Sequence, residues 1–402
     1  MSQDAIRSLI VDFTSTFGGA FEHALSLASE LNEVDGVSAG LVSAQQDKST
    51  LTRVPKSVPF FRFPPYRRYG SESGLRAGWR KYFDMFLDVA AGEVPRALRL
   101  ARIGQKPHAD VIHLNNLINI QQSCVLAAKL LGAKSISCHQ DFEYHSRLAK
   151  KVAQYVDHHV AISQAIKDDL LAFGIDESRI TIIHNGIDTN RFSPTAQGVD
   201  LSSEFNVPEN AITIAIFGRL VPWKGHTDYL KAFAQVARAN ELAHGLIVGD
   251  VSDGEMLYEE ELKQLANELG IYDRVTFTGY RADVPEILNS VDIAVHMSNR
   301  PEPFGLVVSE AMACGRPIVA MAEGGPLEIV VDGETGFLVP PRNPEAAAEK
   351  INLLAADAEL RRRFGDAGRE RANVEFSAHA CAQKYLALYR KLLDEPSTNG
   401  HR

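Results

Sequence analysis

The hydrophobic positions of the chain fall into short β-branched runs, and each run is followed by a segment with helical periodicity. In the first half these runs cover residues 8–13, 38–44, 109–114, 133–139 and 157–163. In the second half they cover residues 212–218, 244–250, 274–280, 291–298 and 316–322. Strands that alternate with helices predict βαβ units, and therefore an α/β fold with parallel sheets covered by helices on both faces.

Ten strands are too many for one open sheet, so the pattern favours two Rossmann-like domains. The segment 186–210 is rich in turn formers and polar residues, which is typical of a connection between domains. Two such domains that face each other would place a central ligand cleft at the carboxyl ends of both sets of strands.

We therefore expect an N-terminal Rossmann-like domain over residues 1–190 and a C-terminal one over residues 191–375. The last segment, 376–402, contains an amphipathic pattern over residues 377–395. We expect this pattern to form a helix that crosses back and packs on the N-terminal domain, followed by a disordered tail.

Composition narrows the class of protein. The 402 residues are 45% hydrophobic and carry a formal charge of −9, which disfavours a nucleic-acid partner. The N-terminal apolar segment is too short for a signal peptide, and no run approaches the ~20 apolar residues of a membrane-spanning helix. Four cysteines lie in apolar stretches without paired spacing, and we expect buried thiols in a cytoplasmic protein: Cys124, Cys138, Cys314 and Cys381.

Two loops at strand ends have the composition of anion-binding sites. Gly18 and Gly19 follow the first strand and permit a tight turn before a helix, although such a pair is often only a structural turn. Arg219 and Lys224 follow the strand 212–218, where two cations suit a diphosphate. The alternative is a pair of solvated surface cations.

Glu302 and Glu310 lie eight positions apart, across a loop and a predicted helix that starts near Gly305 and stops near Gly315. If all eight residues were helical they would be ~12 Å apart, wider than the ~5 to 9.5 Å between the carboxyl groups of a glycosidase. The spacing suits a nucleotide-sugar, whose two hydroxyl-rich ends flank a diphosphate. The alternative is a glutamate that stabilises the helix dipole and a second, solvated glutamate.

Downstream, Gly324 and Gly325 predict another close backbone approach, and the segment 332–339 predicts a turn into a short strand.

Together these motifs resemble glycosyltransferase family 4, the retaining nucleotide-sugar transferases with the two-domain GT-B fold. The resemblance covers nearly the whole chain and includes the family's E-x7-E signature. The matching segments are "FGG", "VAISQAIKDDL", "IIHNGIDTNRF", "FGRLVPWKGH", "FTGY", "EPFGLVVSEAMACGRPIVA" and "GGPLEIVVDGETGFLV".

For the transferred groups, the resemblance implies that Arg219 and Lys224 neutralise the diphosphate leaving group. Glu302, together with the backbone of Phe304, Gly305 and Leu306, would position the donor sugar and phosphates, and Glu310 would hold the ribose.

For the remaining contacts, the resemblance implies that Gly19 approaches the donor phosphate or sugar. The backbone around Tyr280 and Arg281 would meet the base, and His139, at the end of the strand 133–139, would be aimed at the transferred sugar. Many relatives have a small polar or acidic residue where this chain has Phe21, on the acceptor side of the glycine loop. The acceptor itself is unknown: a glycan, a glycolipid or a small molecule.

The resemblance also implies a mechanism. No D-x-D motif occurs in the chain, so we expect no metal and no other cofactor, with preorganised cations stabilising the leaving diphosphate. The family is thought to transfer hexose-type sugars with retention, by front-face attack. Two other functions stay open, namely another GT-B nucleotide-sugar enzyme (an epimerase or hydrolase) and a non-catalytic nucleotide-sugar binding protein.

Residues 60–86 mix arginines with aromatic residues, which stands out in an acidic chain. One interpretation is peripheral contact with the inner face of a membrane and a lipid-linked acceptor. The alternatives are an anionic acceptor pocket and an irregular segment packed on the sheet with solvated arginines.

Overall fold

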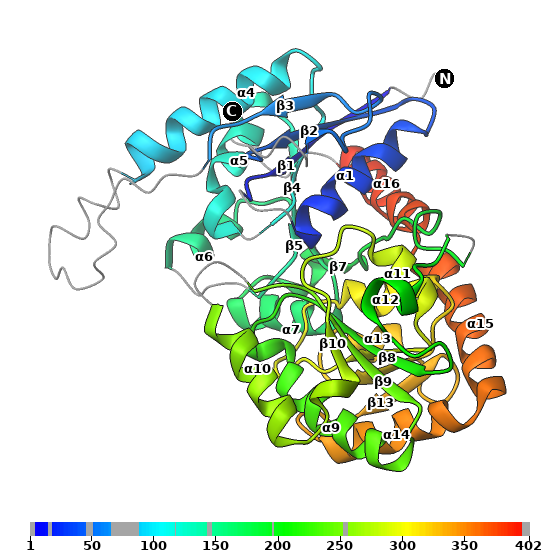
Figure 1. Ribbon diagram of the computed structural model, residues 1–402. Coiled ribbons are helices and arrows are strands. Elements are labelled where there is room, and N and C mark those ends of the chain that lie inside the picture. Colours follow the sequence, from blue (N-terminus) through cyan, green and yellow to red (C-terminus); the bar gives the residue numbers. More distant parts are fainter. Residues whose placement is uncertain are drawn as a thin grey trace, which may run out of the picture. The chain divides into compact units, whose positions relative to one another are not determined.

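The chain divides by its internal contacts into two units, each built around one sheet (Figure 1). The first unit comprises Met1–Gly186 with Ala378–Arg402, and the second comprises Ile187–Ser377. The computed structural model describes residues 5–14, 18–45, 51–65, 88–116, 118–142, 147–194, 197–251 and 256–395. Every strand pair in the described residues is parallel, which confirms the predicted α/β class with two Rossmann-like sheets.

The sheet of the first unit has seven strands in the order β3-β2-β1-β4-β5-β6-β7. They are β1 (Ile6–Asp12), β2 (Val37–Ser43), β3 (Phe60–Arg62), β4 (Val111–Leu114), β5 (Lys134–His139), β6 (His158–Ala161) and β7 (Ile180–Ile182). The helices are α1 (Gly19–Asn32), η1 (Asp88–Glu93), α4 (Val94–Gln105), α5 (Ile118–Leu131), α6 (Arg147–Ala153), α7 (Gln164–Phe173), η2 (Glu177–Arg179) and α16 (Ala378–Asp394). The C-terminal helix α16 packs beside α1, and Figure 1 shows the two in red and blue.

The sheet of the second unit has six strands in the order β10-β9-β8-β11-β12-β13. They are β8 (Ile212–Phe217), β9 (Ala243–Val248), β10 (Val275–Phe277), β11 (Ile293–His296), β12 (Ile318–Met321) and β13 (Gly336–Val339). The helices are α8 (Leu201–Phe205), η3 (Pro222–Lys224), α9 (His226–Ala239), α10 (Met256–Glu268), η4 (Tyr272–Arg274), α11 (Val284–Ser290), α12 (Leu306–Ala313), α13 (Pro326–Ile329), α14 (Pro344–Ala356) and α15 (Ala358–Glu375).

The hydrophobic runs form strands because both faces of each sheet are covered by helices. All ten predicted strands are present, and the predicted turn and strand at 332–339 becomes β13. The predicted helix limit at Gly315 is also confirmed, since Gly315 follows α12 with a φ of +67°. Of the strands described, the three-residue edge strands β3 and β7 were not predicted.

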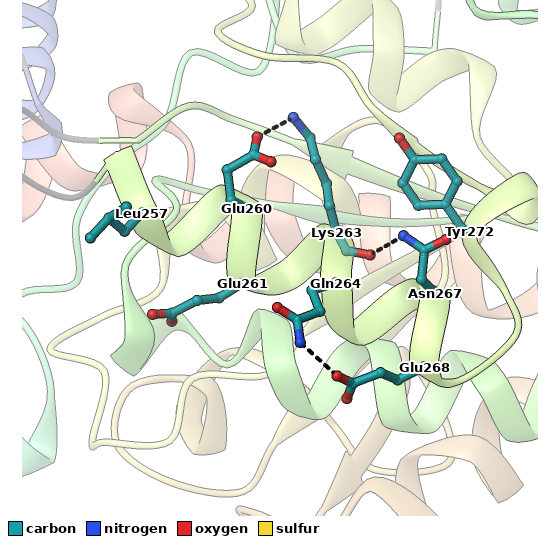
Figure 2. Close-up of a pocket in the computed structure, with 8 residues that line it drawn as sticks. All are labelled: Leu257, Glu260, Glu261, Lys263, Gln264, Asn267, Glu268 and Tyr272. Atoms are coloured by element: carbon teal, nitrogen blue, oxygen red, sulfur yellow. Dashed lines mark hydrogen bonds and ion pairs between the residues drawn. The ribbon is translucent and has the colours of Figure 1, made fainter.

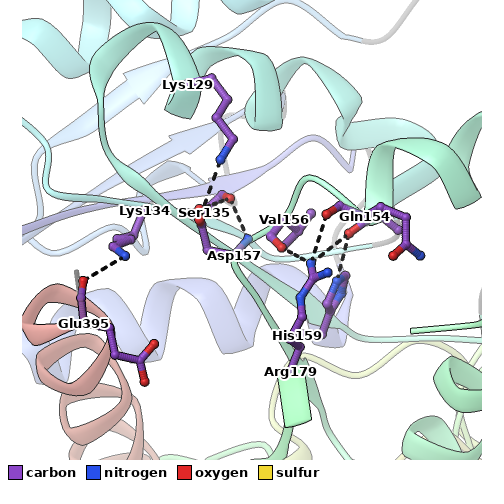
Figure 3. A network of polar contacts seen from close by, with 10 residues as sticks. Lys129, Lys134, Ser135, Gln154, Val156, Asp157, His159, Arg179 and Glu395 are labelled. Atoms are coloured by element: carbon purple, nitrogen blue, oxygen red, sulfur yellow. Dashed lines mark hydrogen bonds and ion pairs between the residues drawn. The ribbon is translucent and has the colours of Figure 1, made fainter. Parts of the chain in front are cut away.

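An aspartate just before a strand fixes strand register in both units. In the first unit, the Asp157 carboxylate accepts hydrogen bonds from the Ser135 amide at 2.8 Å and the Ser135 hydroxyl at 2.7 Å (Figure 3). In the second unit, Asp292 accepts the same pair of bonds from Thr213, at 2.8 and 2.9 Å. Each aspartate therefore satisfies one amide and one hydroxyl of the adjacent strand.

An arginine at the end of a 3-10 helix anchors an edge strand in each unit. Figure 3 shows the Arg179 guanidinium on the carbonyl oxygens of residues that follow α6, just before β7 begins. Arg274, just before β10, donates likewise to the carbonyl oxygens of Ala237 and Asn240, both at 2.6 Å. Because a guanidinium offers five donors in a rigid fork, one residue can satisfy several helix-end carbonyls at once.

A polar cluster lies within the core of the first unit, where α16 packs. His113 Nδ1 lies 2.7 Å from the Tyr389 hydroxyl, and the Tyr385 hydroxyl donates to Cys138 Sγ at 3.0 Å. Burial lowers the pKa of His23 to about 4. Burial, with a smaller effect of His23, lowers the pKa of His113 to about 3, so both rings are neutral at pH 7. As predicted, the four cysteines are buried and free.

The basic and aromatic segment 60–86 lies largely outside the described residues, of which only 60–65 belong to it. Within the part of the chain that the structure describes, no helix is both long and apolar enough to cross a bilayer.

Candidate functional site

Lys224 and Glu302 meet at the carboxyl ends of two neighbouring strands of the second unit. Lys224 ends η3, which follows β8, whereas Glu302 lies in the loop after β11, and β8 pairs with β11. The two loops are joined by a backbone hydrogen bond of 2.8 Å from the amide of Asn299 to the carbonyl of Trp223. Lys224 Nζ then donates to Glu302 Oε1 at 3.0 Å and to Oε2 at 2.8 Å.

The close approach of these loops depends on Gly225, which lies between η3 and α9 with a φ of +77°. A Cβ at this position would lie 1.7 Å from the Met297 carbonyl oxygen, so the backbone has no room for any other residue. The "KG" of "FGRLVPWKGH" therefore does two things: the lysine supplies the charge and the glycine permits the contact that places it.

Glu302 is held by two further side chains from the end of β11. The Ser298 hydroxyl donates to Glu302 Oε2 at 2.8 Å, and His296 Nε2 lies 3.3 Å from the same oxygen. All three residues are buried, with exposed fractions of 4% for His296, 1% for Ser298 and 8% for Glu302.

The surroundings keep Glu302 ionised. Burial by itself would raise the pKa of this carboxyl, but the Lys224 charge and the hydrogen bond from His296 outweigh it and hold the pKa well below its usual range. The site therefore contains a fixed negative charge and a fixed positive charge in direct contact.

The glycine pair 324–325 packs against the same loop from the end of β12. The amide of Gly325 donates to the carbonyl of Glu302 at 2.8 Å, and Glu302 and Gly324 form an isolated parallel bridge. A Cβ at Gly324 would lie 2.3 Å from the Glu302 carbonyl oxygen, and one at Gly325 would lie 2.1 Å from that of Phe304. The predicted close approach is thus an approach to the Glu302 loop, which it holds in place.

Arg219 differs from Lys224 in that its guanidinium is not engaged by another side chain of the described residues. It lies two residues beyond β8, its side chain is exposed, and within the described residues that side chain makes no hydrogen bond or ion pair. A guanidinium without a partner, close in sequence to a paired lysine, is available to an incoming anion.

The helix α12 carries the second glutamate of the signature. Gly305 precedes the helix with a φ of +98°, which favours glycine, and Leu306 is the first helical residue. Phe304 is buried, and Glu310 lies half-buried one turn further along the helix. The free N–H groups of the first turn lie beside Glu302 in sequence and favour a bound anion.

Tyr280 and Arg281 follow β10. The Tyr280 side chain is exposed, whereas the Arg281 guanidinium is committed to the carboxylates of Glu204 and Asp283. These two ion pairs raise the pKa of Arg281, with the hydrogen bond to Asp283 as the larger cause. A ligand can therefore meet the backbone of this turn or the exposed Tyr280 ring, whereas the Arg281 guanidinium is already engaged.

The remaining predicted residues belong to the first unit. Gly19 starts α1 and is exposed, and the Asn115 side-chain amide donates to the carbonyl of the next helical residue, Ala20, at 2.7 Å. His139 ends β5 but has no exposed surface, and its Nε2 lies 2.9 Å from His159 Nδ1.

Three buried polar residues at strand ends were not predicted. His296 and Ser298 hold Glu302, and the only signal for them is a pair of polar residues at alternate positions where an apolar strand ends. Asp12 ends β1, and burial raises its pKa to about 6 against opposing hydrogen bonds from Thr14 and Asn116. A carboxylate at the end of an apolar run would have identified it.

A shallow surface depression of about 680 Å³ lies elsewhere, along α10, and contains none of the predicted site residues. Figure 2 shows that its polar side chains bond to one another, Lys263 to Glu260 and Gln264 to Glu268. It lies on the surface of α10, with Tyr272 of η4 also in its lining.

Comparison with known proteins gives two family matches that together span most of the chain. A family model described as "Glycosyl transferases group 1" matches residues 200–371, and one described as "Glycosyltransferase Family 4" matches residues 17–191.

Among curated proteins, α-maltose-1-phosphate synthase of Mycolicibacterium smegmatis is 32% identical over 266 residues, covering 62% of this chain and 67% of that protein. D-inositol 3-phosphate glycosyltransferase of Segniliparus rotundus is 34% identical over 223 residues, covering 55% and 49%. The chain thus spans about half to two thirds of the length of these relatives.

Among solved structures, the HepE protein of Anabaena in complex with UDP and glucose is 25% identical, with a TM-score of 0.77. The match covers 96% of this chain and 99% of that one. Both Rossmann-like units therefore have counterparts in a protein that binds a nucleotide and a sugar.

Proposed function

Because the chain belongs to glycosyltransferase family 4 and is a nucleotide-sugar-dependent transferase of the GT-B type, we propose that it is a retaining, metal-independent enzyme. It moves a hexose-type sugar from a nucleoside-diphosphate-sugar to an acceptor hydroxyl. The observation that carries this proposal is the ion pair of the partly buried Lys224 with the buried Glu302, at 2.8 Å. Arg219, close in sequence to Lys224, has a guanidinium without a partner among the described residues.

The cations act on the leaving group. Breaking the anomeric bond places negative charge on the diphosphate, and cations that are already in position stabilise that charge without reorganisation. The Lys224 ammonium has three N–H groups and uses two on Glu302, which leaves one for a phosphate oxygen. Arg219 can grip two phosphate oxygens, and the first turn of α12 adds N–H donors.

Glu302 serves as a binding group for the donor sugar. Its carboxylate is ion-paired with Lys224 and contacted by Ser298 and His296, which lowers its nucleophilicity and leaves Oε1 with one acceptor site for a sugar hydroxyl. A covalent glycosyl-enzyme on Glu302 is therefore disfavoured. Retention then requires front-face attack, in which the departing phosphate takes the proton of the acceptor hydroxyl as the new bond forms.

The other roles rest on the family resemblance. We assign the ribose to Glu310, the base to the backbone around Tyr280 and Arg281, and the donor phosphate or sugar to Gly19. His139 is assigned to the transferred sugar, and this assignment rests on the family alone, because the ring is fully buried against His159.

The HepE structure supports a uridine nucleotide as the first donor to test, since it contains UDP and glucose. The acceptor stays open between a glycan, a glycolipid and a small molecule. The basic and aromatic composition of residues 60–86 supports a lipid-linked acceptor and peripheral membrane contact, which co-sedimentation with anionic vesicles would test.

Thermal unfolding with UDP, GDP and ADP, each with and without a common sugar attached, tests the donor site. A ligand at a hundred times its dissociation constant should stabilise the native state by about 2.7 kcal/mol. With the donor known, NMR of the product reports its anomeric configuration, and an assay with a chelator tests metal independence. Inversion of configuration, or loss of activity with the chelator, would contradict the corresponding part of the proposal.

A further inference from the structure

Three buried side chains at the end of β11 form a connected chain of hydrogen bonds. His296 Nε2 lies 3.1 Å from Ser298 Oγ, and Ser298 Oγ lies 2.8 Å from Glu302 Oε2. Each of these residues is more than nine-tenths buried, so bulk water competes little for these hydrogen bonds. The direction of each bond is therefore fixed by the protons that these groups carry.

The proton positions follow from the acceptor at the end of the chain. An ionised carboxylate can only accept, so the single hydroxyl proton of Ser298 points to Glu302. The Ser298 oxygen is then an acceptor, and His296 must supply the N–H from Nε2. The other ring nitrogen, Nδ1, is buried without a partner in the described part of the chain. A proton there would be an unsatisfied buried donor, so the ring is neutral with its proton on Nε2.

We propose that His296 and Ser298 are positioning residues that orient Glu302 toward the donor sugar. His296 fixes the rotation of the Ser298 hydroxyl, and Ser298 fixes the rotation of the Glu302 carboxylate. This inference deepens the proposed function and rests on it for the identity of the ligand.

The relay leaves one acceptor site on Glu302 for a ligand. With the His296 N–H directed to Ser298, Glu302 Oε2 accepts from Lys224 and Ser298, whereas Oε1 accepts from Lys224 alone. A carboxylate oxygen offers about two acceptor sites, so Oε1 keeps one acceptor site and Oε2 keeps none. That site lies beside the unused N–H of Lys224, an arrangement that takes one sugar hydroxyl and one phosphate oxygen together.

The proton assignment is tested first, on the ligand-free protein, by NMR of histidines labelled with ¹⁵N in the ring. We expect His296 to be neutral with its proton on Nε2 at pH 7, and the His296→Gln variant identifies its signal. In Ser298→Ala the signal should shift, because its acceptor is gone. A proton on Nδ1, a charged ring, or an unchanged signal in Ser298→Ala would each overturn the relay.

The positioning role is tested by comparing two ligands, UDP and UDP-glucose. Losing a hydrogen bond to a charged group should weaken UDP-glucose binding by about tenfold in Ser298→Ala. Binding of bare UDP, which lacks the sugar, should stay within about twofold. His296→Gln should retain most of the sugar-dependent affinity, because its amide N–H reaches the place of Nε2, whereas His296→Met should lose it.

A matched control exists in the same unit. His244 Nε2 lies 2.9 Å from the Thr276 hydroxyl, a partly buried pair of the same chemistry that does not contact Glu302. Thr276→Ala should leave the ratio of the two affinities and the His296 signal unchanged. Equal weakening of UDP and UDP-glucose in Ser298→Ala would show a merely structural role and overturn the proposal.

Failure of the proposed function and failure of the relay give different binding results. If the wild-type protein binds none of the nucleotides or nucleotide-sugars, the proposed function is wrong, and the NMR result decides the relay. If the wild type binds UDP-glucose more tightly than UDP and Ser298→Ala keeps that preference, the donor site stands and the relay is wrong.

Discussion

Replacing Lys224 by methionine should convert Glu302 from a stabilising into a destabilising residue. Methionine keeps much of the stem of the lysine side chain and removes only its charge and its donors. Glu302 would remain 8% exposed, with bonds from Ser298 and His296 but without the cation that compensates its burial. A buried charge without a partner is the costly case.

The magnitude follows from the burial of the pair. Removing one partner of a buried ion pair costs about 3–5 kcal/mol. Because the Lys224 side chain is 19% exposed, we expect the lower end, about 3 kcal/mol at pH 7. In the double variant Lys224→Met/Glu302→Gln no charge is buried, and we expect the loss to shrink to about 1 kcal/mol.

The pH dependence of the free energy of unfolding tests the same prediction more sharply. In the wild type the pKa of Glu302 is lowered in the folded state, so its stabilising effect is present above the ordinary value of 4.5 and is lost at lower pH. In Lys224→Met burial should dominate and raise the pKa above 4.5. The loss of folding stability caused by the unpaired Glu302 is then absent below pH 4.5. It grows by about 1.4 kcal/mol per pH unit until the pH passes the raised pKa. The difference between wild type and variant should therefore narrow between pH 7 and pH 5.

Urea unfolding measures this difference, with Trp223 as the probe. Trp223 lies in η3, with Lys224 Nζ 4.2 Å from its ring centre, and replacing the other tryptophan, Trp79, by phenylalanine isolates its signal. A difference between Lys224→Met and wild type that is equal at pH 5 and pH 7 would refute the reasoning. So would a double variant no more stable at pH 7 than Lys224→Met, since the loss would then not come from a stranded carboxylate.

Four further outcomes follow from the described contacts. Arg219→Ala should raise the dissociation constant for UDP by about tenfold and change stability by less than about 0.5 kcal/mol, as calorimetry and unfolding would show; unchanged affinity contradicts the clamp. Glu302→Ala should lower turnover by about a hundredfold while circular dichroism stays native, and wild-type rates would remove its assigned role. In the wild type, the pKa of His23 is lowered to about 4 in the folded state, so the protein loses stability as pH falls below 6.5. His23→Leu should therefore reduce the stability lost between pH 7.5 and pH 5 by about 2 kcal/mol. An unchanged pH profile argues against a neutral buried ring. Gly325→Ala should lower the free energy of unfolding by more than about 2 kcal/mol and abolish donor binding. Gly333→Ala, at a φ of +77° in open space, should lower it by only about 1 kcal/mol. Equal losses would mean that the Glu302 loop moves to accommodate the added methyl group.

The sequence predicts the central strands well because their burial on both faces leaves a continuous apolar signal. It does not predict β7, a three-residue strand of Ile180–Ile182 at the edge of the first sheet. Its place depends on Arg179, which donates to carbonyl oxygens beyond α6, and on a contact of 2.8 Å between His158 and Thr181. In both contacts the partners lie more than twenty residues apart, beyond the reach of a local pattern.

The candidate site shows the same division. Local pattern places Lys224 and Glu302 each at the end of an apolar strand, but they are 78 residues apart in the sequence. Only the pairing of β8 with β11 makes them neighbours. The sequence therefore assigns the lysine to the diphosphate and the glutamate to the sugar as separate groups, and does not predict that each holds the other in the absence of a donor.

His139 marks the limit of reasoning from a motif. Its position at the end of β5 follows from the strand pattern, and its role follows from the family, but neither determines what covers it. The ring has no exposed surface, and its Nε2 lies 2.9 Å from Nδ1 of His159. Nothing in the local sequence around His159 predicts that it contacts His139. Burial is the larger cause, and the effect of His139 the next, in lowering the pKa of His159 well below its usual range, so His159 is neutral at pH 7. One of its nitrogens lies 3.1 Å from the Ala153 carbonyl, which only an N–H can satisfy; the other must then accept, and His139 donates to it from Nε2. His139 Nε2 is therefore engaged by His159 and can meet a sugar only if the pair separates, a constraint that no motif in the sequence contains.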